Sequence, residues 1–100
     1  MPKGYWIVRV DVSDPEAYKA YVAANAAAFH KYSARFLVRG GPHETVEGVS
    51  RARNVVIEFK DYVTALACYH SPEYAAAKAL RVAASTADII VIEGYDGPQP

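Results

Sequence analysis

The sequence has one cysteine among its 100 residues, Cys68, which excludes a disulfide within the chain. Proteins without disulfides are typical of a reducing compartment, so we expect a cytoplasmic location. Cys68 lies in an alanine-rich segment with helical spacing. A buried, unreactive thiol is much commoner in such a place than a catalytic one.

Neither sign of charge is in excess. Eleven Lys and Arg balance eleven Asp and Glu, and no basic run interrupts the chain. Binding to nucleic acid or to an anionic membrane surface depends on clustered positive charge. We therefore expect neither partner.

Other signals are missing as well. No stretch approaches the roughly 18 apolar residues that span a bilayer, and the start, MPKGYWIVRVDV, lacks the long apolar region of a secretory signal. His30, His43 and His70 share no ligand spacing with one another or with Cys68, so we expect no metal site. There is no GxGxxG after the first strand, no Walker loop and no Ser-His-Asp signature, and we expect no cofactor.

What the chain does contain is a 52% hydrophobic fraction, enough for one domain over residues 1–100 with its own core. Period-two and period-3.6 patterns predict strands at 4–12, 35–39, 53–60 and 87–93 and helices at 15–34 and 61–81. The second helix is bent at Ser71-Pro72-Glu73, where proline in a first turn and a serine cap restart it. Residues 43–50 are a polar excursion that can be a hairpin arm or an ordered loop.

The first helix has two possible starts. Either Ser13 caps it with Glu16 closing a capping box, or Asp14 caps it with Pro15 in the first helical position. Its expected buried stripe is Tyr18, Val22, Asn25 or Ala26, and Phe29.

The order βαββαβ with short connections predicts an α+β, ferredoxin-like fold, a four-stranded antiparallel sheet with two helices on one face. Period-two counting divides the strands between a helix-covered face and an open face. The covered face is expected to hold Trp6, Val8, Val10, Phe36, Val38, Val55, Ile57, Phe59, Ile90 and Ile92. The open face is expected to hold Ile7, Arg9, Asp11, Leu37, Arg39, Val56, Glu58, Ile89, Val91 and Glu93.

The expected open face mixes aliphatic residues with paired charges, which a surface in water rarely does so densely. We expect a second copy to cover it in a two-fold homodimer, and the alternative is an exposed sheet with scattered ion pairs. Residues 44–50 are expected to join this dimer contact or to form the rim of a pocket.

Several elements in order resemble a known family: KGYWIVRVDVSDPEAYKAY, FLVRGG, the pair Glu47-Gly48, and RNVVIEFKDYVTALACYHSPEY followed by Arg81. Together they resemble the domain of unknown function 1330 family, small and mainly bacterial proteins of the dimeric α/β-barrel superfamily. Lys60 departs from this pattern where relatives often have proline. The resemblance implies a ferredoxin-like protomer paired as a barrel and implies no reaction. Superfamily relatives include cofactor-free monooxygenases, haem-handling enzymes and isomerases, but fold does not carry function.

Two groups of polar residues are candidates for a site. Arg39 beside Gly40 and Gly41 combines a guanidinium with backbone that a ligand can approach, which favours carboxylate capture or an ion pair with Glu58 or Glu93. Glu58 is a candidate general base or the structural partner of an arginine, and we expect it to face Arg39 across neighbouring strands.

The second group surrounds the Ser71-Pro72 bend and Arg81. Tyr69 and Tyr74 can line a pocket or can simply be core residues with satisfied hydroxyls, and His70 is expected to be exposed. Two hypotheses follow. The first is a homodimeric binder or cofactor-free enzyme for a small acidic or aromatic compound, with Glu58 and Tyr69 catalytic and Arg39, Gly40, Gly41, Tyr74 and Arg81 binding substrate. The second is a non-catalytic dimeric sensor or assembly module whose charges only fix the interface.

Overall fold

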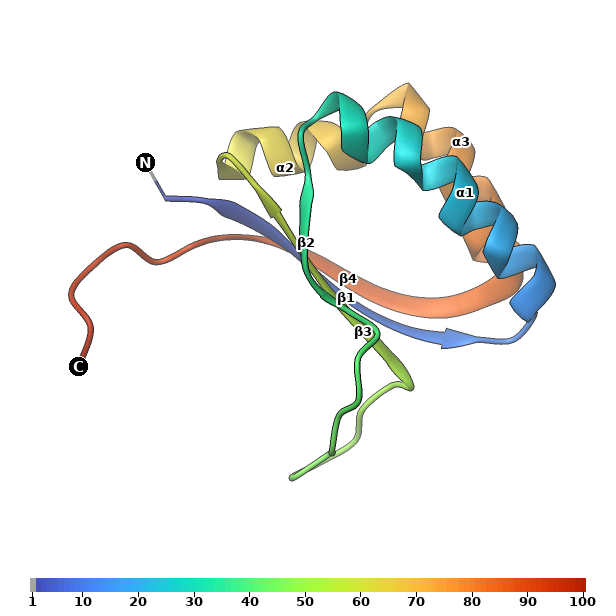
Figure 1. Cartoon of the computed structure of the whole chain (residues 1–100), viewed down its shortest axis with the longest axis horizontal. Helices are drawn as coiled ribbons and strands as arrows, with labels where there is room; N and C mark the ends of the chain where they lie inside the picture. The colour runs from blue at the N-terminus through green and yellow to red at the C-terminus, as the bar shows by residue number, and fades with distance from the viewer. Residues whose placement is uncertain (1) are drawn as a thin grey trace.

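The computed structural model describes residues 2–100 as one layer of sheet under one layer of helices (Figure 1). The elements in chain order are β1 (Gly4–Val12), α1 (Pro15–Lys31), β2 (Arg35–Arg39), β3 (Arg53–Phe59), α2 (Tyr62–Tyr69), α3 (Pro72–Ala84) and β4 (Ser85–Glu93). The strands are antiparallel in the order β2-β3-β1-β4. This is the expected α+β, ferredoxin-like fold. No helix within residues 2–100 is long and apolar enough to cross a membrane.

The caps set where the helices begin. The Asp14 side chain accepts from Ala17 N with Pro15 in the first turn, so the second of the two possible starts is the one used. Ser13 instead donates its hydroxyl to Ala84 O at 3.0 Å. Asp61 caps α2 by accepting from Thr64 N, and Ser71 caps α3 by accepting from Tyr74 N, as their sequence positions predict.

Helix α1 ends at Lys31, earlier than the expected end near residue 34. Tyr32 is its C-cap, and Ser33 has φ of +54°, a left-handed conformation that a continuing helix cannot include. The early end turns the chain directly into β2.

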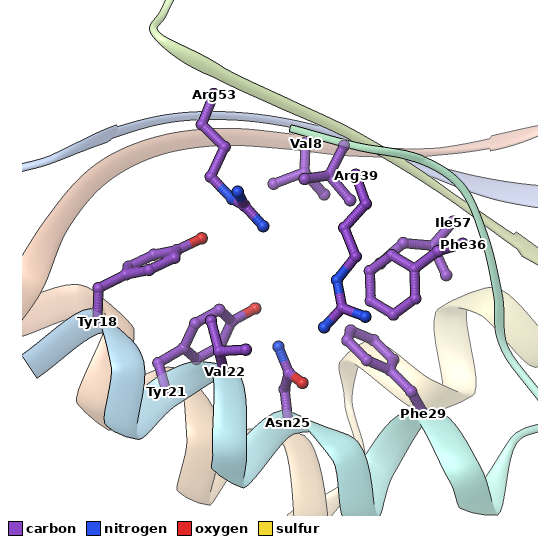
Figure 2. A pocket seen from close by; sticks show the side chains of 11 residues that line it. Val8, Tyr18, Tyr21, Val22, Asn25, Phe29, Phe36, Arg39, Arg53 and Ile57 are labelled. Atoms are coloured by element: carbon purple, nitrogen blue, oxygen red, sulfur yellow. The ribbon is translucent and has the colours of Figure 1, made fainter. Parts of the chain in front are cut away.

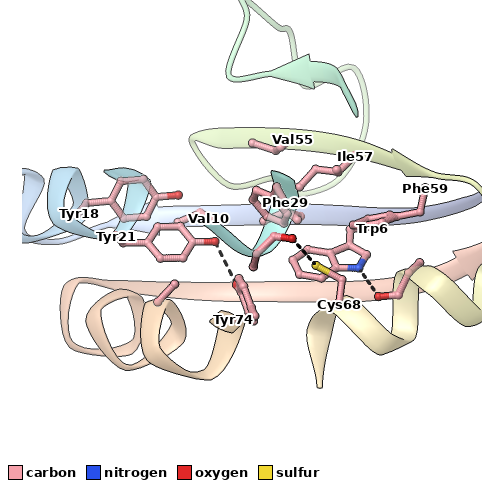
Figure 3. Close-up of a cluster of buried hydrophobic side chains, with 14 of the residues drawn as sticks. Trp6, Val10, Tyr18, Tyr21, Phe29, Val55, Ile57, Phe59, Cys68 and Tyr74 are labelled. Atoms are coloured by element: carbon pink, nitrogen blue, oxygen red, sulfur yellow. Dashed lines mark hydrogen bonds between the residues drawn. The ribbon is translucent and has the colours of Figure 1, made fainter. Parts of the chain in front are cut away.

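Trp6 is the centre of the core between sheet and helices (Figure 3). It is fully buried, and its Nε1 donates to Ala65 O of α2 at 2.9 Å. Four aromatic rings surround its indole at centroid distances between 4.9 and 5.6 Å, those of Phe29, Phe59, Tyr69 and Tyr74. The rings of Phe29, Tyr69 and Tyr74 meet the indole edge to face, and this geometry stabilises beyond the area that it buries.

The predicted face assignment is wrong for β4. Val8 pairs with Ile89 and Trp6 with Val91, so Ile89 and Val91 lie on the helix-covered face. Ile90 and Ile92 are on the open face and are 53% and 44% exposed. The two acidic residues of this strand, Asp88 and Glu93, fall in opposite phases, so they do not agree on which face is polar. The prediction placed Glu93 on the open face, whereas the pairing of Asp88 with Arg9 puts Asp88 there.

The face assignment of β2 is also wrong after its first half. A register shift between Phe36 and Val38, where β2 pairs with β3, changes the phase of the strand. Phe36 lies on the covered face as expected, but Val38 is opposite Val56 on the open face and is 44% exposed. Arg39 is opposite Val55 and lies on the helix-covered side.

The open face of the sheet is bare in the single chain. By the strand register it comprises Tyr5, Ile7, Arg9, Asp11, Arg35, Val38, Asn54, Val56, Glu58, Asp88, Ile90 and Ile92. The polar excursion at 43–50 is a loop without strand or helix, and it projects away from the sheet on the side opposite the helices (Figure 1).

Candidate functional site

A cleft opens between α1 and the edge of the sheet formed by β2 and β3 (Figure 2). Its lining residues are Val8, Tyr18, Tyr21, Val22, Asn25, Phe29, Phe36, Arg39, Arg53, Val55 and Ile57. The cleft is narrow, with a cavity volume of about 20 Å³. This is room for about one water molecule.

Two arginines face this cleft from different strands. Figure 2 shows the Arg53 guanidinium reaching from the sheet and the Arg39 guanidinium reaching from β2 toward the same space. Within residues 2–100 neither arginine has an ion pair, and Nε of Arg53 is buried without a hydrogen-bond partner. A buried donor without a partner is rare and costly in a folded protein. Two unpaired guanidiniums in one cleft are suited to binding an anion.

Both arginines contact aromatic rings. The Arg39 guanidinium carbon lies 4.0 Å from the ring centroid of Phe36, and that of Arg53 lies 5.9 Å from the ring centroid of Tyr18. These cation–π contacts orient the charges without neutralising them. Arg39 is exposed to solvent, whereas Arg53 is half-buried.

Gly40 allows the Arg53 guanidinium to lie against the backbone at the end of β2. Its φ is +67°, and a Cβ at this position would collide with Nη1 of Arg53. Gly40 N also donates to Asn54 O at 2.9 Å, which fixes the turn. Gly41 is different, because a Cβ there would meet nothing within 4 Å and the residue is exposed. The structure therefore connects Gly40, and not Gly41, with the cleft.

Helix α1 supplies the polar groups opposite the arginines. The hydroxyls of Tyr18 and Tyr21 point toward the cleft, and the Asn25 side chain lies between Tyr21 and Arg39 in Figure 2. Burial raises the pKa of Tyr21 well above its ordinary value of 10. Tyr21 is therefore a neutral phenol over the physiological pH range.

The candidates around the helix bend lie outside this cleft. Tyr74 is fully buried, its hydroxyl 3.0 Å from the Tyr21 hydroxyl and 3.3 Å from Arg81 Nε, which donates to it. Tyr69 packs on Trp6 and Tyr74, and together with Arg81 it lines a separate hollow at the edge strand β4. His70 is exposed, as expected.

Glu58 does not face Arg39. Its partner across β2 is Arg35, and its partner on β1 is Tyr5, whose hydroxyl donates to Glu58 Oε2 at 3.3 Å. Glu58 points to the open face, and Arg39 to the other side of the sheet. The shift in register along β2 is the reason, because it moves Arg39 from the open face to the covered one.

Cys68 is buried, as expected, and burial raises the pKa of its thiol to about 12. No group of three or more His, Cys, Asp or Glu in the described part of the chain, residues 2–100, is placed to hold a metal ion.

Arg53 and Tyr21 are the cleft residues that the sequence reading missed. The period-two count that puts Val55, Ile57 and Phe59 on the covered face also puts Arg53 there, so the signal was present. Tyr18 and Asn25 were found through helical spacing, but as core residues. An asparagine, an arginine and two tyrosines among expected core positions are the pattern that indicates a site.

Comparison with known families gives one match over most of the chain. The profile of a family described as a domain of unknown function (DUF1330) matches residues 3–95. No curated protein matches the chain.

Solved structures share the fold at low sequence identity. A protein of unknown function from Rhodopseudomonas palustris has a TM-score of 0.77 at 15% identity, with 96% of this chain and 85% of that one covered. SnoaB, a cofactor-independent oxygenase from Streptomyces nogalater, has a TM-score of 0.63 at 16% identity, covering 100% of this chain and 97% of that one. A dimeric protein of unknown function and ferredoxin-like fold from Bacteroides fragilis has a TM-score of 0.54 at 17% identity, covering 91% and 95%. Identities this low support the fold alone.

Proposed function

We propose, from the premise that the chain belongs to the DUF1330 family, that it binds a small organic anion with an aromatic or unsaturated body in the cleft between α1 and the β2–β3 edge. The observation that carries this proposal is the pair of inward-facing guanidiniums, Arg39 and Arg53, one with a buried donor that nothing in residues 2–100 accepts. A carboxylate bound between them would accept that hydrogen bond and supply the missing negative charge.

The rest of the cleft fits the organic part of such a ligand. Phe29, Phe36 and the aliphatic side chains of β1 and β3 make its floor apolar, and Tyr18, Tyr21 and Asn25 offer polar contacts. Because the cleft is narrow, binding requires Arg39 to swing outward and close on the ligand. A clamp of this kind is consistent with Arg39, the more exposed of the two cleft arginines, lying against the Phe36 ring.

The lining residues include no carboxylate and no histidine. Of the two candidates for catalysis, Glu58 lies on the open face and Tyr69 lies beside β4. The placement therefore favours binding, with any chemistry depending on the tyrosine hydroxyls and on reactivity of the ligand itself. SnoaB is described as a cofactor-independent oxygenase, which makes chemistry without a cofactor a reasonable second reading for this cleft.

A thermal-shift screen of benzoate, phenylacetate and phenols tests this proposal, because a ligand of the folded state raises the melting temperature. We expect carboxylates to raise it and neutral phenols of the same size to leave it unchanged. Arg53→Met abolishes the shift, whereas Lys19→Met, which removes an exposed charge from α1, keeps it. Equal shifts by acids and neutral analogues, or a full shift in Arg53→Met, would contradict anion binding.

We also propose that the open face is the contact between two copies of this chain. The support is a row of aliphatic side chains on a bare sheet, of which Val38, Ile90 and Ile92 are each more than two-fifths exposed. The loop at 40–52 belongs to the same side, since Arg51 binds Asp11 and Asp88 at 2.8 and 2.7 Å. Residues 44–50 contribute nothing to the lining of the cleft, which favours a role in the dimer over a role at the rim of this cleft.

Sedimentation tests the dimer. Val56→Lys puts an unpaired charge at the centre of the open face and should give monomer or aggregate. Val82→Lys, at a residue of α3 that is 60% exposed, is the matched control and should leave the mass unchanged. A wild-type monomer at micromolar concentration would overturn the proposal.

A further inference from the structure

Three buried side chains connect the two sides of the helical layer. The Tyr21 hydroxyl lines the cleft and lies 3.0 Å from the Tyr74 hydroxyl, drawn as a dashed line in Figure 3. Arg81 Nε donates to the same Tyr74 oxygen at 3.3 Å. Arg81 is 94% buried by its own fold, lines the hollow beside β4 and has no ion pair within residues 2–100.

The direction of these hydrogen bonds follows from the chemistry of the groups. A guanidinium can only donate, so the Tyr74 oxygen accepts from Arg81 and cannot point its own proton toward that positive charge. Tyr74 is fully buried, and among residues 2–100 its hydroxyl has one other partner, Tyr21. A buried O–H without an acceptor is costly, so Tyr74 donates to Tyr21. Tyr21 then has its own proton left to give.

We infer that Arg81 is a positioning residue for the cleft: through Tyr74 it fixes Tyr21 as a hydrogen-bond donor, so the cleft selects organic acids that carry an acceptor oxygen, such as a carbonyl, close to the carboxylate. The inference rests on the proposed function and adds to it a class of ligand. The arginines bind the carboxylate, and Tyr21 reads the second oxygen. Donation from Tyr74 also strengthens the bond that Tyr21 makes, because hydrogen bonds in a chain polarise one another.

The binding test uses two matched probes, phenylglyoxylate and phenylacetate, which differ by a carbonyl in place of a methylene. Calorimetric titration of the wild type should favour phenylglyoxylate by about two- to tenfold, the effect of one added hydrogen bond. Tyr21→Phe should abolish this preference and still bind both acids. Tyr69→Phe, which removes the hydroxyl of another aromatic neighbour of Tyr74, is the control and should keep it.

Two variants separate positioning from packing. Arg81→Ala opens the hollow to water, which can accept the hydrogen bond from the Tyr74 hydroxyl. Tyr21 can then donate to Tyr74 instead of to the ligand, so the preference for phenylglyoxylate should fall. Adding Tyr74→Phe to Arg81→Ala removes the competing acceptor and should restore the preference. If Arg81 acts only by packing, the double variant will be no better than the single one, and the inference is overturned.

A measurement on the wild type alone does not depend on any variant folding or on any ligand. In a nitrogen-15 spectrum the Arg81 Nε–H should be protected from exchange with solvent, because it is buried and donates to Tyr74. Exchange at the rate of an exposed arginine would overturn the hydrogen-bond chain from Arg81 through Tyr74 to Tyr21, even where both probes bind. Protected Arg81 together with no binding of either acid would instead overturn the proposed function, and with it this reading of the ligand.

Discussion

Replacing Arg53 by methionine should stabilise the ligand-free protein, against the usual sign for a partly buried arginine. The substitution removes a buried Nε–H that has no acceptor within residues 2–100. Leaving such a donor unpaired costs about 1–3 kcal/mol, and that cost disappears with the side chain. The methionine keeps much of the apolar stem that packs in the cleft.

The loss to set against this gain is the contact with Tyr18. The Arg53 guanidinium carbon lies 5.9 Å from that ring centroid, a distance at the outer limit of a cation–π interaction worth about 0.5–1 kcal/mol. The net expectation is a free energy of unfolding higher by about 1 kcal/mol. For a chain of this size that corresponds to a melting temperature higher by about 4–8 °C.

Urea unfolding followed by circular dichroism measures the change directly. Arg39→Met is the matched comparison, since Arg39 is exposed and rests on Phe36 at 4.0 Å without a buried unpaired atom. We expect that variant to be slightly less stable than the wild type, and both variants to lose anion binding. A clear loss of stability in Arg53→Met would show that Arg53 is a structural residue whose buried Nε–H is not destabilising. Its retention at a cost in stability is the signature of a functional side chain.

Three further predictions follow from the described contacts. The Cys68 thiol, with its pKa raised to about 12 by burial, should react with Ellman's reagent at neutral pH only at the rate of unfolding, and rapid reaction in native buffer would contradict its placement. The backbone N–H of Ala52, and after it the Arg51 side chain, hold the pKa of the Asp11 carboxyl below its usual 3.8. The stability that this carboxylate contributes is therefore present above pH 3.8 and is lost as the pH falls through the lower pKa of the folded protein. Asp11→Asn should flatten the acid side of a stability–pH profile, and an unchanged slope would contradict the contact. Deleting residues 44–50 should weaken self-association by sedimentation and leave the melting curve cooperative, whereas unchanged association would make the loop a connector only.

Most of the fold could be predicted from the sequence because its signals are local. The caps at Asp14, Asp61 and Ser71 mark helix starts through one side-chain oxygen each. Trp6 and the alternating residues of β1 and β3 mark the covered face through a polar–apolar contrast. These features depend on neighbours within a few residues of one another, and a single sequence contains them.

The site depended on features that are not local. The register shift in β2 reverses the direction of Arg39, and nothing within residues 35–39 signals it. In β4 the run of aliphatic residues from Ile89 to Ile92 fits either face, so pairing with β1 decides its phase. As a result Arg39 and Glu58, expected as a pair, lie on opposite sides of the sheet. Arg53 was assigned to a strand but was not considered as a ligand-binding residue, because its importance comes from a buried Nε–H without a hydrogen-bond acceptor, which only the structure shows.

The most direct test of anion binding is to follow the Nε–H signals of the arginines while benzoate is added to nitrogen-15-labelled protein. Binding in the cleft should give large, saturable shifts for Arg53 and Arg39, and the Arg53 signal should become protected as its buried donor gains an acceptor. Arg51, already paired with Asp11 and Asp88, serves as the internal control and should not move. Shifts spread equally over all arginines, or an Arg53 signal that stays fixed at saturating benzoate, would contradict anion binding between Arg39 and Arg53.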